Sequence, residues 1–422
     1  MARARLRWRW FALLLLSALV LIAEGGAFGK HGFPVPPDTR PEGCRKYGLK
    51  DFAGHTVSII IPWLAETWEH MEATMHALVK MTPDKLVTEY LWISDGNADA
   101  REEQLKAISP KVRVFAFQER QGLHRAKIKG VELATAPVLV FFEAHCIPNK
   151  HWLQHILHRV VENPRALAMP TLDVIPQDNF RMYQAVSPGH WRYEWNFNLI
   201  YTNPGGDYYR GNQREPYTSP GTSGGIFAMR KDWFQRLGLF DEGMREWGGD
   251  HMELTMKVWR CGGRIEIVPC SRVGHLYRDP SHRPYDVEVN TVVHNYKRLA
   301  ELWAKDHLDL FYKMKPEAIP MQLQGMEKVQ ANYEQLEREL HCKNMSWYLD
   351  NIDHEMKWEM DRICHPYAKR GDPIKCKGKL VPGRWTVTEA MPSHAYRAAR
   401  AAAEARAEEA AGHGQAVDPE EL

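Results

Sequence analysis

The sequence Val138-Leu-Val-Phe-Phe-Glu143-Ala144-His145-Cys146 is an uninterrupted apolar run that ends in a carboxylate and an imidazole two residues apart. Such a run predicts a buried strand. Side chains at positions i and i+2 leave a strand on the same face, so Glu143 and His145 can both bind one divalent cation at its carboxyl end. Ligands of open α/β sheets bind at that end. The alternative interpretation is a solvated pair of side chains in a loop.

Strand and helix patterns alternate before this run. In chain order, the sequence predicts a strand over Val57–Ile61, a helix over Glu66–Lys80, a strand over Leu86–Ser94 that ends at Asp95, a strand over Val112–Phe117 and a helix over Leu123–Thr135. This alternation predicts a mainly parallel sheet with helices on both faces, a Rossmann-like α/β fold. No G-x-G-x-x-G motif follows the first strand, which argues against a dinucleotide site.

The second half of the chain is less regular. Residues 193–220 are rich in aromatic residues, Asn, Gly and Pro, which predicts long loops that build a binding surface. Trp247-Gly-Gly-Asp250-His251 then opens a helix over Met252–Trp259, and a strand over Arg264–Pro269 precedes Val273-Gly274-His275. Met326–Leu340 predicts a further helix.

The first 25 residues predict a targeting segment. Arg3, Arg5, Arg7 and Arg9 precede an apolar run, Trp10–Ala23, that is shorter than the ~20 residues of a membrane-spanning helix. We therefore expect a signal peptide or a signal anchor, a short stem over residues 26–43, and a folded body in the oxidising lumen of the secretory pathway. The net charge of +2 gives no reason to expect nucleic acid as a partner.

The cysteines fit this compartment. The chain has seven of them, and six allow fifteen pairings, so spacing alone does not identify the disulfides. Asn344-Met-Ser346 is a glycosylation sequon that is usable in the same lumen. Residues 393–422 include a tract of Ala, Arg and Glu that predicts a solvated helix or a disordered tail.

A third ligand, one further imidazole, would complete the metal site. His275 is the best candidate, because it follows a predicted strand and stands beside Gly274. On spacing alone, an ordinary surface or core histidine is the favoured interpretation of His275. Mixed nitrogen and oxygen ligands suit Mn²⁺, whereas Mg²⁺ prefers oxygen alone. A metal at the edge of such a sheet can bind a diphosphate, and Arg278 can add a second positive charge. The site therefore predicts group transfer from a nucleoside diphosphate, and in this compartment sugar transfer from a nucleotide sugar.

These residues resemble those of the polypeptide N-acetylgalactosaminyltransferases, retaining glycosyltransferases of GT-A fold that start mucin-type O-glycans on Ser or Thr. The resemblance covers about residues 44–349. Glu143-Ala-His145 is similar to the family's D-x-H motif, and Trp247-Gly-Gly-Asp-His-Met-Glu253 to its W-G-G-E-N-x-E motif. The segment from Cys261 to His275 is similar throughout, and the similarity continues through Arg298–Trp303 and Cys342–Leu349.

The resemblance implies a role for each matching position. The Mn²⁺ ligands would be Glu143, His145 and His275. The UDP-sugar would be bound by Asp95, Arg120, Ser223, Gly224, Gly225, His251 and Tyr285, whereas Trp247, Asp250 and Arg278 would serve catalysis. Departing UDP would be stabilised by Arg278, and the acceptor hydroxyl of a Ser- or Thr-containing protein would attack from the face that UDP leaves. The implied disulfides are Cys44–Cys270 and Cys261–Cys342, with Cys364–Cys376 as a further pair and Cys146 free.

The resemblance also implies an organisation and a location. The GT-A catalytic domain would cover residues 44–352, followed by a helical extension over 353–392, without the ricin-type lectin domain usual in the family. We expect a Golgi type II membrane protein whose only membrane contact is the N-terminal segment, or a secreted or lumenal protein if that segment is cleaved.

Some positions differ from the family pattern. Leu64-Ala65-Glu66-Thr67 stands where the family has H-N-E-A, so the uracil-stacking His is missing while Glu66 remains. Glu143 replaces an Asp, and Asp250 and His251 replace the Glu and Asn that contact the sugar. Such changes can alter donor choice. Two alternatives to GalNAc transfer therefore stay open: another donor, UDP-GlcNAc or a UDP-hexose, and a catalytically silent relative that binds a nucleotide sugar or a client protein.

Overall fold

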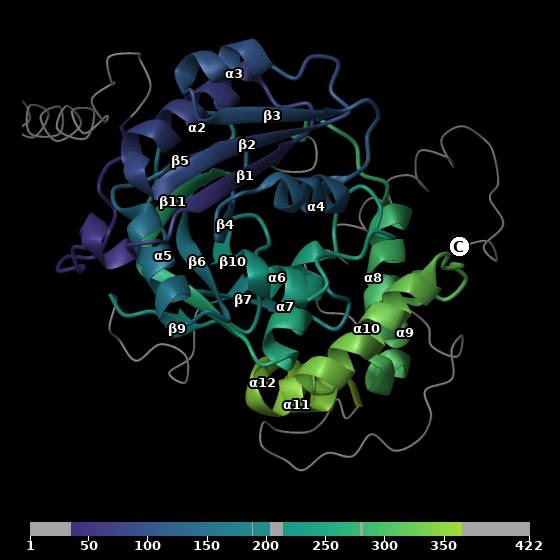
Figure 1. The fold of residues 1–422 in the computed structure, drawn as a ribbon. Coiled ribbons are helices and arrows are strands. Elements are labelled where there is room, and N and C mark those ends of the chain that lie inside the picture. Colours follow the sequence, from purple (N-terminus) through teal and green to yellow (C-terminus); the bar gives the residue numbers. More distant parts are fainter. Residues whose placement is uncertain (1–34, 188, 203–213, 279–281, 365–422) are drawn as a thin grey trace, which may run out of the picture.

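The computed structural model describes residues 35–187, 189–202, 214–278 and 282–364. A mixed sheet of nine strands forms its centre, with the order β3-β2-β1-β4-β10-β6-β11-β5 and β9 paired to β11 (Figure 1). The strands of this sheet are β1 (Val57–Trp63), β2 (Val87–Asp95), β3 (Val112–Phe117), β4 (Val138–Phe141), β5 (Cys146–Pro148), β6 (Ala166–Ile175), β9 (Tyr217–Thr218), β10 (Phe227–Arg230) and β11 (Arg264–Leu276). The predicted targeting segment and residues 365–422 lie outside the described ranges.

The predicted parallel arrangement is confirmed for the first half of the sheet. Strands β3, β2, β1 and β4 are parallel neighbours, as the alternation of strands and helices predicts. The second half is mixed, because β10 runs antiparallel between β4 and β6, whereas β11 is parallel to β6. The segment predicted as loops also contains a separate hairpin, β7 (His190–Tyr193) and β8 (Leu199–Thr202).

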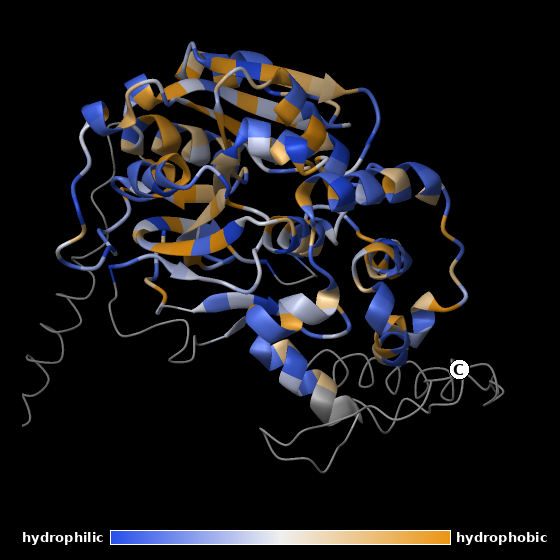
Figure 2. Cartoon of the chain, turned by 60° about the horizontal axis from the view of Figure 1, so that its bottom comes forward, coloured by the Kyte–Doolittle hydropathy of each residue, from blue (hydrophilic) through white to orange (hydrophobic). Residues whose placement is uncertain are grey.

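Helices cover both faces of the sheet, as expected. They are α2 (Trp68–Met81), α3 (Glu102–Ile108), α4 (Leu123–Leu133), α5 (Trp152–Glu162), α6 (Lys231–Arg236), α7 (Asp250–Arg260), α8 (Val289–Trp303), α9 (Leu308–Met314), α10 (Met326–Leu340), α11 (Met345–Asn351) and α12 (His354–Cys364). Successive side chains of β1 enter opposite cores: Ile59 and Ile61 pack with α2 and α5, and Ile60 packs with α4. Figure 2 shows the apolar residues concentrated on the strands and the polar residues on the outer helices.

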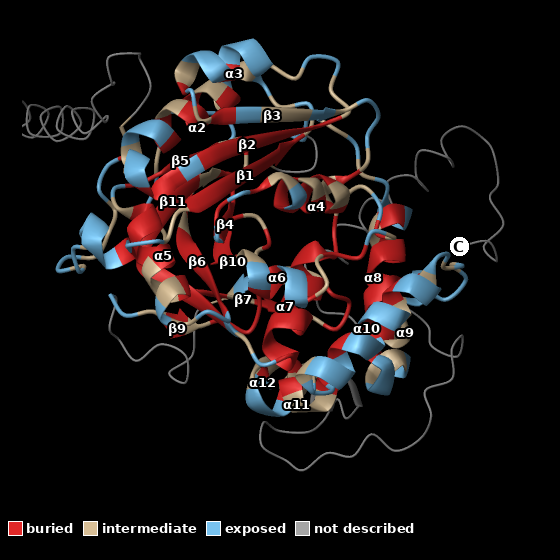
Figure 3. Cartoon of the chain, in the orientation of Figure 1, coloured by how far each residue is buried: buried red, intermediate tan, exposed pale blue. Residues whose placement is uncertain are grey.

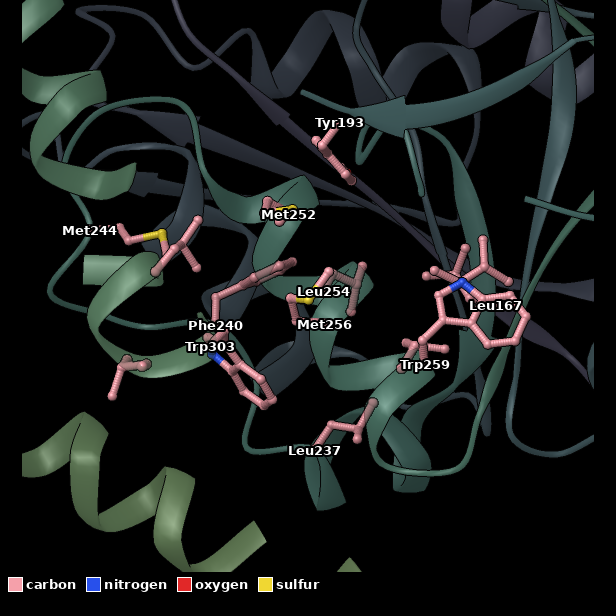
Figure 4. Close-up of a cluster of buried hydrophobic side chains, with 14 of the residues drawn as sticks. Leu167, Tyr193, Leu237, Phe240, Met244, Met252, Leu254, Met256, Trp259 and Trp303 are labelled. Carbon is pink, nitrogen blue, oxygen red and sulfur yellow. The ribbon is translucent and has the colours of Figure 1, made fainter. Parts of the chain in front are cut away.

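Helix α7 lies in the middle of the larger core. All of its residues from Asp250 to Arg260 are buried (Figure 3). Its Met252, Leu254 and Met256 pack in one apolar cluster with residues of α8 and the segment before α7 (Figure 4). Gly248 and Gly249 precede it with φ of +93° and +97°, a left-handed conformation that residues with a side chain rarely adopt. These glycines let the chain turn sharply, so that Asp250 is placed at the buried helix N-terminus.

Two disulfides join distant parts of the chain. Cys44 is bonded to Cys270 in β11, and Cys261 at the end of α7 is bonded to Cys342. Both are the pairings that the resemblance implied, and Cys146 is buried and free. The predicted Cys364–Cys376 pair lies partly outside the described residues.

The C-terminal helices pack on the body of the fold. Helix α12, which begins the predicted extension, is joined to the β7–β8 hairpin by ion pairs from Arg192 to Glu355 and Glu359. Asn344 is exposed and caps α11 through a hydrogen bond from the Trp347 N–H, so its glycosylation stays a prediction. In the part of the chain that the structure describes, no helix is long and apolar enough to cross a membrane.

Candidate active site

A pocket opens at the carboxyl ends of β1, β2 and β4, the edge of the sheet where the sequence places a ligand site. Eight of the predicted site residues line it: Asp95, Arg120, Glu143, His145, Gly225, Trp247, Arg278 and Tyr285. The remaining predicted residues, Ser223, Gly224, Asp250, His251 and His275, are outside this lining. Three of them contact lining residues: Gly224 and Asp250 accept hydrogen bonds from Lys127, and His275 contacts Glu143. The pocket wall also contains Glu66 and Lys127, which the sequence analysis did not assign to the site.

Three of these side chains form a cluster with the composition of a metal site. One ligand atom from each of Glu143, His145 and His275 lies within 4.8 Å of the other two. The closest approach is 2.5 Å, between Glu143 Oε2 and His275 Nε2, whereas His145 Nε2 is 3.6 Å from the same oxygen. One carboxylate oxygen and two imidazole nitrogens are a ligand set that suits Mn²⁺. The residues present therefore fit the ion predicted from the sequence.

The local structure behind this cluster differs from the strand expected. Strand β4 ends at Phe141, so Glu143 and His145 lie in the short connection to β5 rather than on one face of a strand. The prediction of a shared strand face was wrong, although the two side chains do converge. His275 lies inside β11, which extends beyond the predicted strand, and it pairs there with Cys146, the neighbour of His145. This antiparallel pairing brings the three side chains together.

The Ser223-Gly224-Gly225 turn passes close to the cluster. A Cβ atom added to Gly225 would lie 2.4 Å from Glu143 Oε1, which is far inside contact distance. Gly224 has a φ of +75°, and a Cβ there would lie 2.7 Å from the Cβ of His251. The bare backbone of this turn thus leaves space for the carboxylate of Glu143.

Glu66 is the centre of a second network. Its Oε2 accepts a hydrogen bond from His145 Nδ1 at 2.9 Å, and its Oε1 lies 2.7 Å from both His70 Nδ1 and Arg278 Nη2. Burial alone would raise the pKa of Glu66, but the hydrogen bonds from His145, His70 and Arg278 outweigh it and hold the pKa well below the usual value. An ionised carboxylate therefore links a cluster histidine to Arg278.

A buried ion pair stands behind the Gly224 turn. Lys127 on α4 donates to Asp250 Oδ2 at 2.5 Å and to the Gly224 carbonyl at 2.8 Å. Burial opposes ionisation of Asp250, but Lys127 and His251 lower the pKa of this carboxyl well below its usual value. Lys127 lies four residues after Leu123 and four before Val131, on the apolar side of the amphipathic helix α4. A lysine at such a position was the signal that could have identified it.

Two polar atoms near this ion pair lack partners in the described part of the chain. They are His251 Nε2 and Ser223 Oγ, both buried. The His251 ring lies parallel to the Tyr193 ring at 5.7 Å, and its Nδ1 is 3.3 Å from Asp250 Oδ1. Buried polar atoms are normally hydrogen-bonded, so both atoms are suited to contact hydroxyl or amide groups of a ligand.

Asp95 and Arg120 lie at the opposite end of the pocket. Asp95 ends β2 and accepts hydrogen bonds from the Gln121 and Gly122 N–H groups at 2.6 and 2.9 Å, while burial raises its pKa. This carboxylate therefore fixes the turn that carries Arg120. The Arg120 guanidinium donates to the Asp286 carbonyl and lies over the Tyr285 ring at 5.6 Å.

Arg283 and Tyr285 cover part of this wall. Arg283 lies over the Trp247 ring at 5.2 Å, and Tyr285 contributes to the lining beside Arg120. Trp247 is thereby packed between the pocket and Arg283.

Comparisons with known proteins identify related glycosyltransferases. The model of glycosyl transferase family 2 matches residues 58–238, and that of the N-terminal domain of galactosyltransferase matches residues 211–282. Human polypeptide N-acetylgalactosaminyltransferase 10 is 32% identical over 341 residues, which are 78% of this chain and 54% of the relative. Human polypeptide N-acetylgalactosaminyltransferase 16 is 33% identical over 385 residues, which are 87% of this chain and 68% of the relative.

A solved structure is similar as well. The crystal structure of GalNAc-T7 with UDP, GalNAc and Mn²⁺ has a TM-score of 0.70 and 27% sequence identity, and the match covers 77% of this chain and 61% of that one. The predicted GT-A fold is thus confirmed. The chain spans about half the length of several of the curated relatives that it matches.

Proposed function

The chain belongs to the polypeptide N-acetylgalactosaminyltransferase family, and we propose that it is a retaining glycosyltransferase that transfers GalNAc from UDP-GalNAc to Ser or Thr of proteins. The observation that carries this proposal is the convergence of Glu143, His145 and His275 beside Arg278 at the carboxyl edge of the sheet. The related GalNAc-T7 structure contains UDP, GalNAc and Mn²⁺, the donor components and the ion that such a site would bind.

Mn²⁺ would be held by Glu143, His145 and His275, and when bound it would neutralise the diphosphate and stabilise UDP as a leaving group. Arg278, fixed by Glu66 at the pocket wall, would donate to the same phosphate oxygens. Arg120 and Asp95 would bind the nucleoside at the far end, with Tyr285 closing over Arg120. These residues together would position the bond between the anomeric carbon and the β-phosphate oxygen.

In the proposed reaction, the acceptor hydroxyl forms a bond to the anomeric carbon on the face that UDP leaves, and its proton passes to the departing β-phosphate. No side-chain base is required. Asp250 would act through Lys127, because Lys127 lines the pocket whereas Asp250 lies behind it. Trp247 would form the wall beside the sugar and exclude water from it.

A second donor remains a candidate because of the residues behind the sugar end of the pocket. Asp250 is engaged by Lys127, and the unpartnered His251 Nε2 stands where the family has an Asn. A hydroxyl of UDP-GlcNAc or a UDP-hexose could satisfy these groups instead. A panel of UDP-sugars with acceptor peptides, measured with and without Mn²⁺, separates the donors. Absence of turnover with every donor would instead support a silent nucleotide-sugar-binding relative.

We further propose that the protein works in the lumen of the secretory pathway, in the Golgi, with residues 44–352 as its catalytic unit. The two disulfides within the described residues are typical of an oxidising compartment. Retention by the N-terminal segment can be tested by carbonate extraction of membranes that contain the full chain. Release of the protein by carbonate would contradict membrane anchoring.

A further inference from the structure

The Glu66 carboxylate contacts both a proposed metal ligand, His145, and the proposed phosphate-binding arginine, Arg278. Glu66 stands directly before α2, and only 4% of its side chain is exposed. Its Oε2 accepts from His145, one of the cluster residues, and its Oε1 accepts from Arg278, whose position is 212 residues away in the sequence. A substitution of Glu66 must therefore affect the positions of both His145 and Arg278.

The hydrogen bonds define which histidine nitrogens carry protons. An ionised carboxylate only accepts hydrogen bonds, so the Nδ1 atoms of His70 and His145 both donate to Glu66. His145 then keeps its Nε2 lone pair for a metal, on the side that faces Glu143. Carboxylate partners of this kind orient metal-binding histidines in many proteins.

Arg278 depends on the same anchor. It lies two residues beyond the end of β11, so strand pairing does not fix its side chain. Glu66 Oε1 accepts a hydrogen bond from its Nη2 at 2.7 Å. The same nitrogen lies 3.0 Å from His70 Nδ1, which donates to Glu66 and therefore does not accept from Arg278. The bond to Glu66 leaves Nε and Nη1 of Arg278 unused by these two partners. The arginine is thus held by one nitrogen while others stay available for phosphate oxygens.

His70 is itself held from two sides. Its backbone N–H donates to Thr67 Oγ1, the N-cap of α2, and its ring packs against Phe180 with a centroid distance of 4.4 Å. Only 18% of its side chain is exposed. The ring therefore presents Nδ1 to Glu66 in one orientation.

We propose that His70 is a positioning residue: it holds the Glu66 carboxylate so that a metal-binding histidine and the phosphate-binding arginine are oriented together. This role rests on the proposed function, since it assigns Arg278 to a diphosphate. It makes metal binding and diphosphate binding depend on one another through Glu66. His70 touches neither ligand itself.

The experiment measures binding by calorimetry with Mn²⁺ alone, and then with inorganic pyrophosphate in the presence of Mn²⁺. Glu66→Gln should weaken Mn²⁺ binding at least ~10-fold, the lower range for loss of such a partner, and should weaken pyrophosphate binding too. His70→Phe keeps the ring beside Phe180 but removes the Nδ1–H donor. It should weaken pyrophosphate binding about tenfold, the equivalent of one charged hydrogen bond, and Mn²⁺ binding less.

His70→Asn retains an N–H donor and should restore most of the pyrophosphate affinity. His55 provides a control, because it is only half-buried and precedes the N-terminal end of β1, away from the carboxyl edge of the sheet; His55→Phe should change neither affinity. In the double variant His70→Phe/Arg278→Ala, pyrophosphate affinity should equal that of Arg278→Ala alone, because His70 acts through the arginine. Thermal unfolding of each variant reports separately on folding.

Additive losses in the double variant, or wild-type affinities in His70→Phe, would overturn the positioning role. A failure of the proposed function looks different. A protein that shows the coupled Mn²⁺ and pyrophosphate binding but transfers no sugar keeps the role of His70 and loses the assigned reaction. Wild-type protein that binds no pyrophosphate would overturn the role of Arg278 and with it the proposal.

Discussion

Replacing Gly225 by Ala should disable the metal cluster while leaving the fold intact. The added Cβ would lie 2.4 Å from Glu143 Oε1, whereas ordinary contact begins at 3.4 Å, so the carboxylate must move by about 1 Å. A misplacement of that size can cost about 100-fold in a positioned site. Because the displaced group is the end of a flexible side chain, the loss of folding stability should be below about 1 kcal/mol.

Calorimetric titration with Mn²⁺ measures the first effect, and urea unfolding the second. We expect Mn²⁺ affinity to fall between 10- and 100-fold. In Gly48→Ala, the control, the nearest atoms to the new Cβ are 3.8 Å away, and affinity should be unchanged. Glu143→Asp combined with Gly225→Ala retracts the carboxylate by about 1.5 Å, one bond length, and should recover part of the affinity. Wild-type Mn²⁺ affinity in a folded Gly225→Ala protein would refute the role of Glu143 as a metal ligand.

Three further predictions concern stability. Lys127→Met leaves the Asp250 carboxylate buried without its partner and should lower the free energy of unfolding, measured in urea, by about 3 to 5 kcal/mol. The double variant Lys127→Met/Asp250→Asn should lose less. Equal losses in the two variants would argue against the ion pair. Joint replacement of Cys261 and Cys342 by Ser opens a loop with a sequence separation of 81 and should cost about 4 kcal/mol. Reducing agent should lower the Tm of that variant less than that of the wild type, because Cys44–Cys270 still remains to be reduced. Burial raises the pKa of Asp353 to about 7, above 3.8 in the unfolded chain, so the folded state binds this proton more tightly. The contribution of Asp353 is then full below about pH 4 and is lost as pH rises from there through 7. Asp353→Asn should therefore gain stability relative to the wild type between about pH 4 and pH 7, and parallel pH profiles would contradict this.

Patterns local in the sequence predicted much of the fold. The apolar runs at Val57–Ile61 and Val138–Phe142 identified β1 and β4, because strands buried on both faces leave few other interpretations. Helix α10 occupies the predicted range Met326–Leu340. The antiparallel insertion of β10 between β4 and β6 was not predictable from local patterns. It depends on the pairing of β10 with β4, about 90 residues away, and with β6, from which irregular segments separate it.

The candidate site was likewise predicted only in part from the sequence. Glu143 and His145 were predicted as a pair by their spacing. His275 was predicted as the third ligand from its place after a strand and beside Gly274, and the resemblance implied it too; the structure brings it to the other two. The links from Glu66 to Arg278 and from Lys127 to Asp250 join residues 212 and 123 positions apart, and no periodicity reports on such contacts. The fold supplies them by placing α2, α4, α7 and the end of β11 around one edge of the sheet.

The central claim is that Glu143, His145 and His275 bind the metal that supports transfer from a UDP-sugar. Transfer of GalNAc from UDP-GalNAc to a Ser/Thr peptide tests it most directly, measured with Mn²⁺ and with EDTA for the wild type and for His145→Ala. We expect transfer by the wild type with Mn²⁺ only, and none by His145→Ala under either condition. Transfer at the wild-type rate in EDTA, or by a folded His145→Ala protein, would contradict the claim.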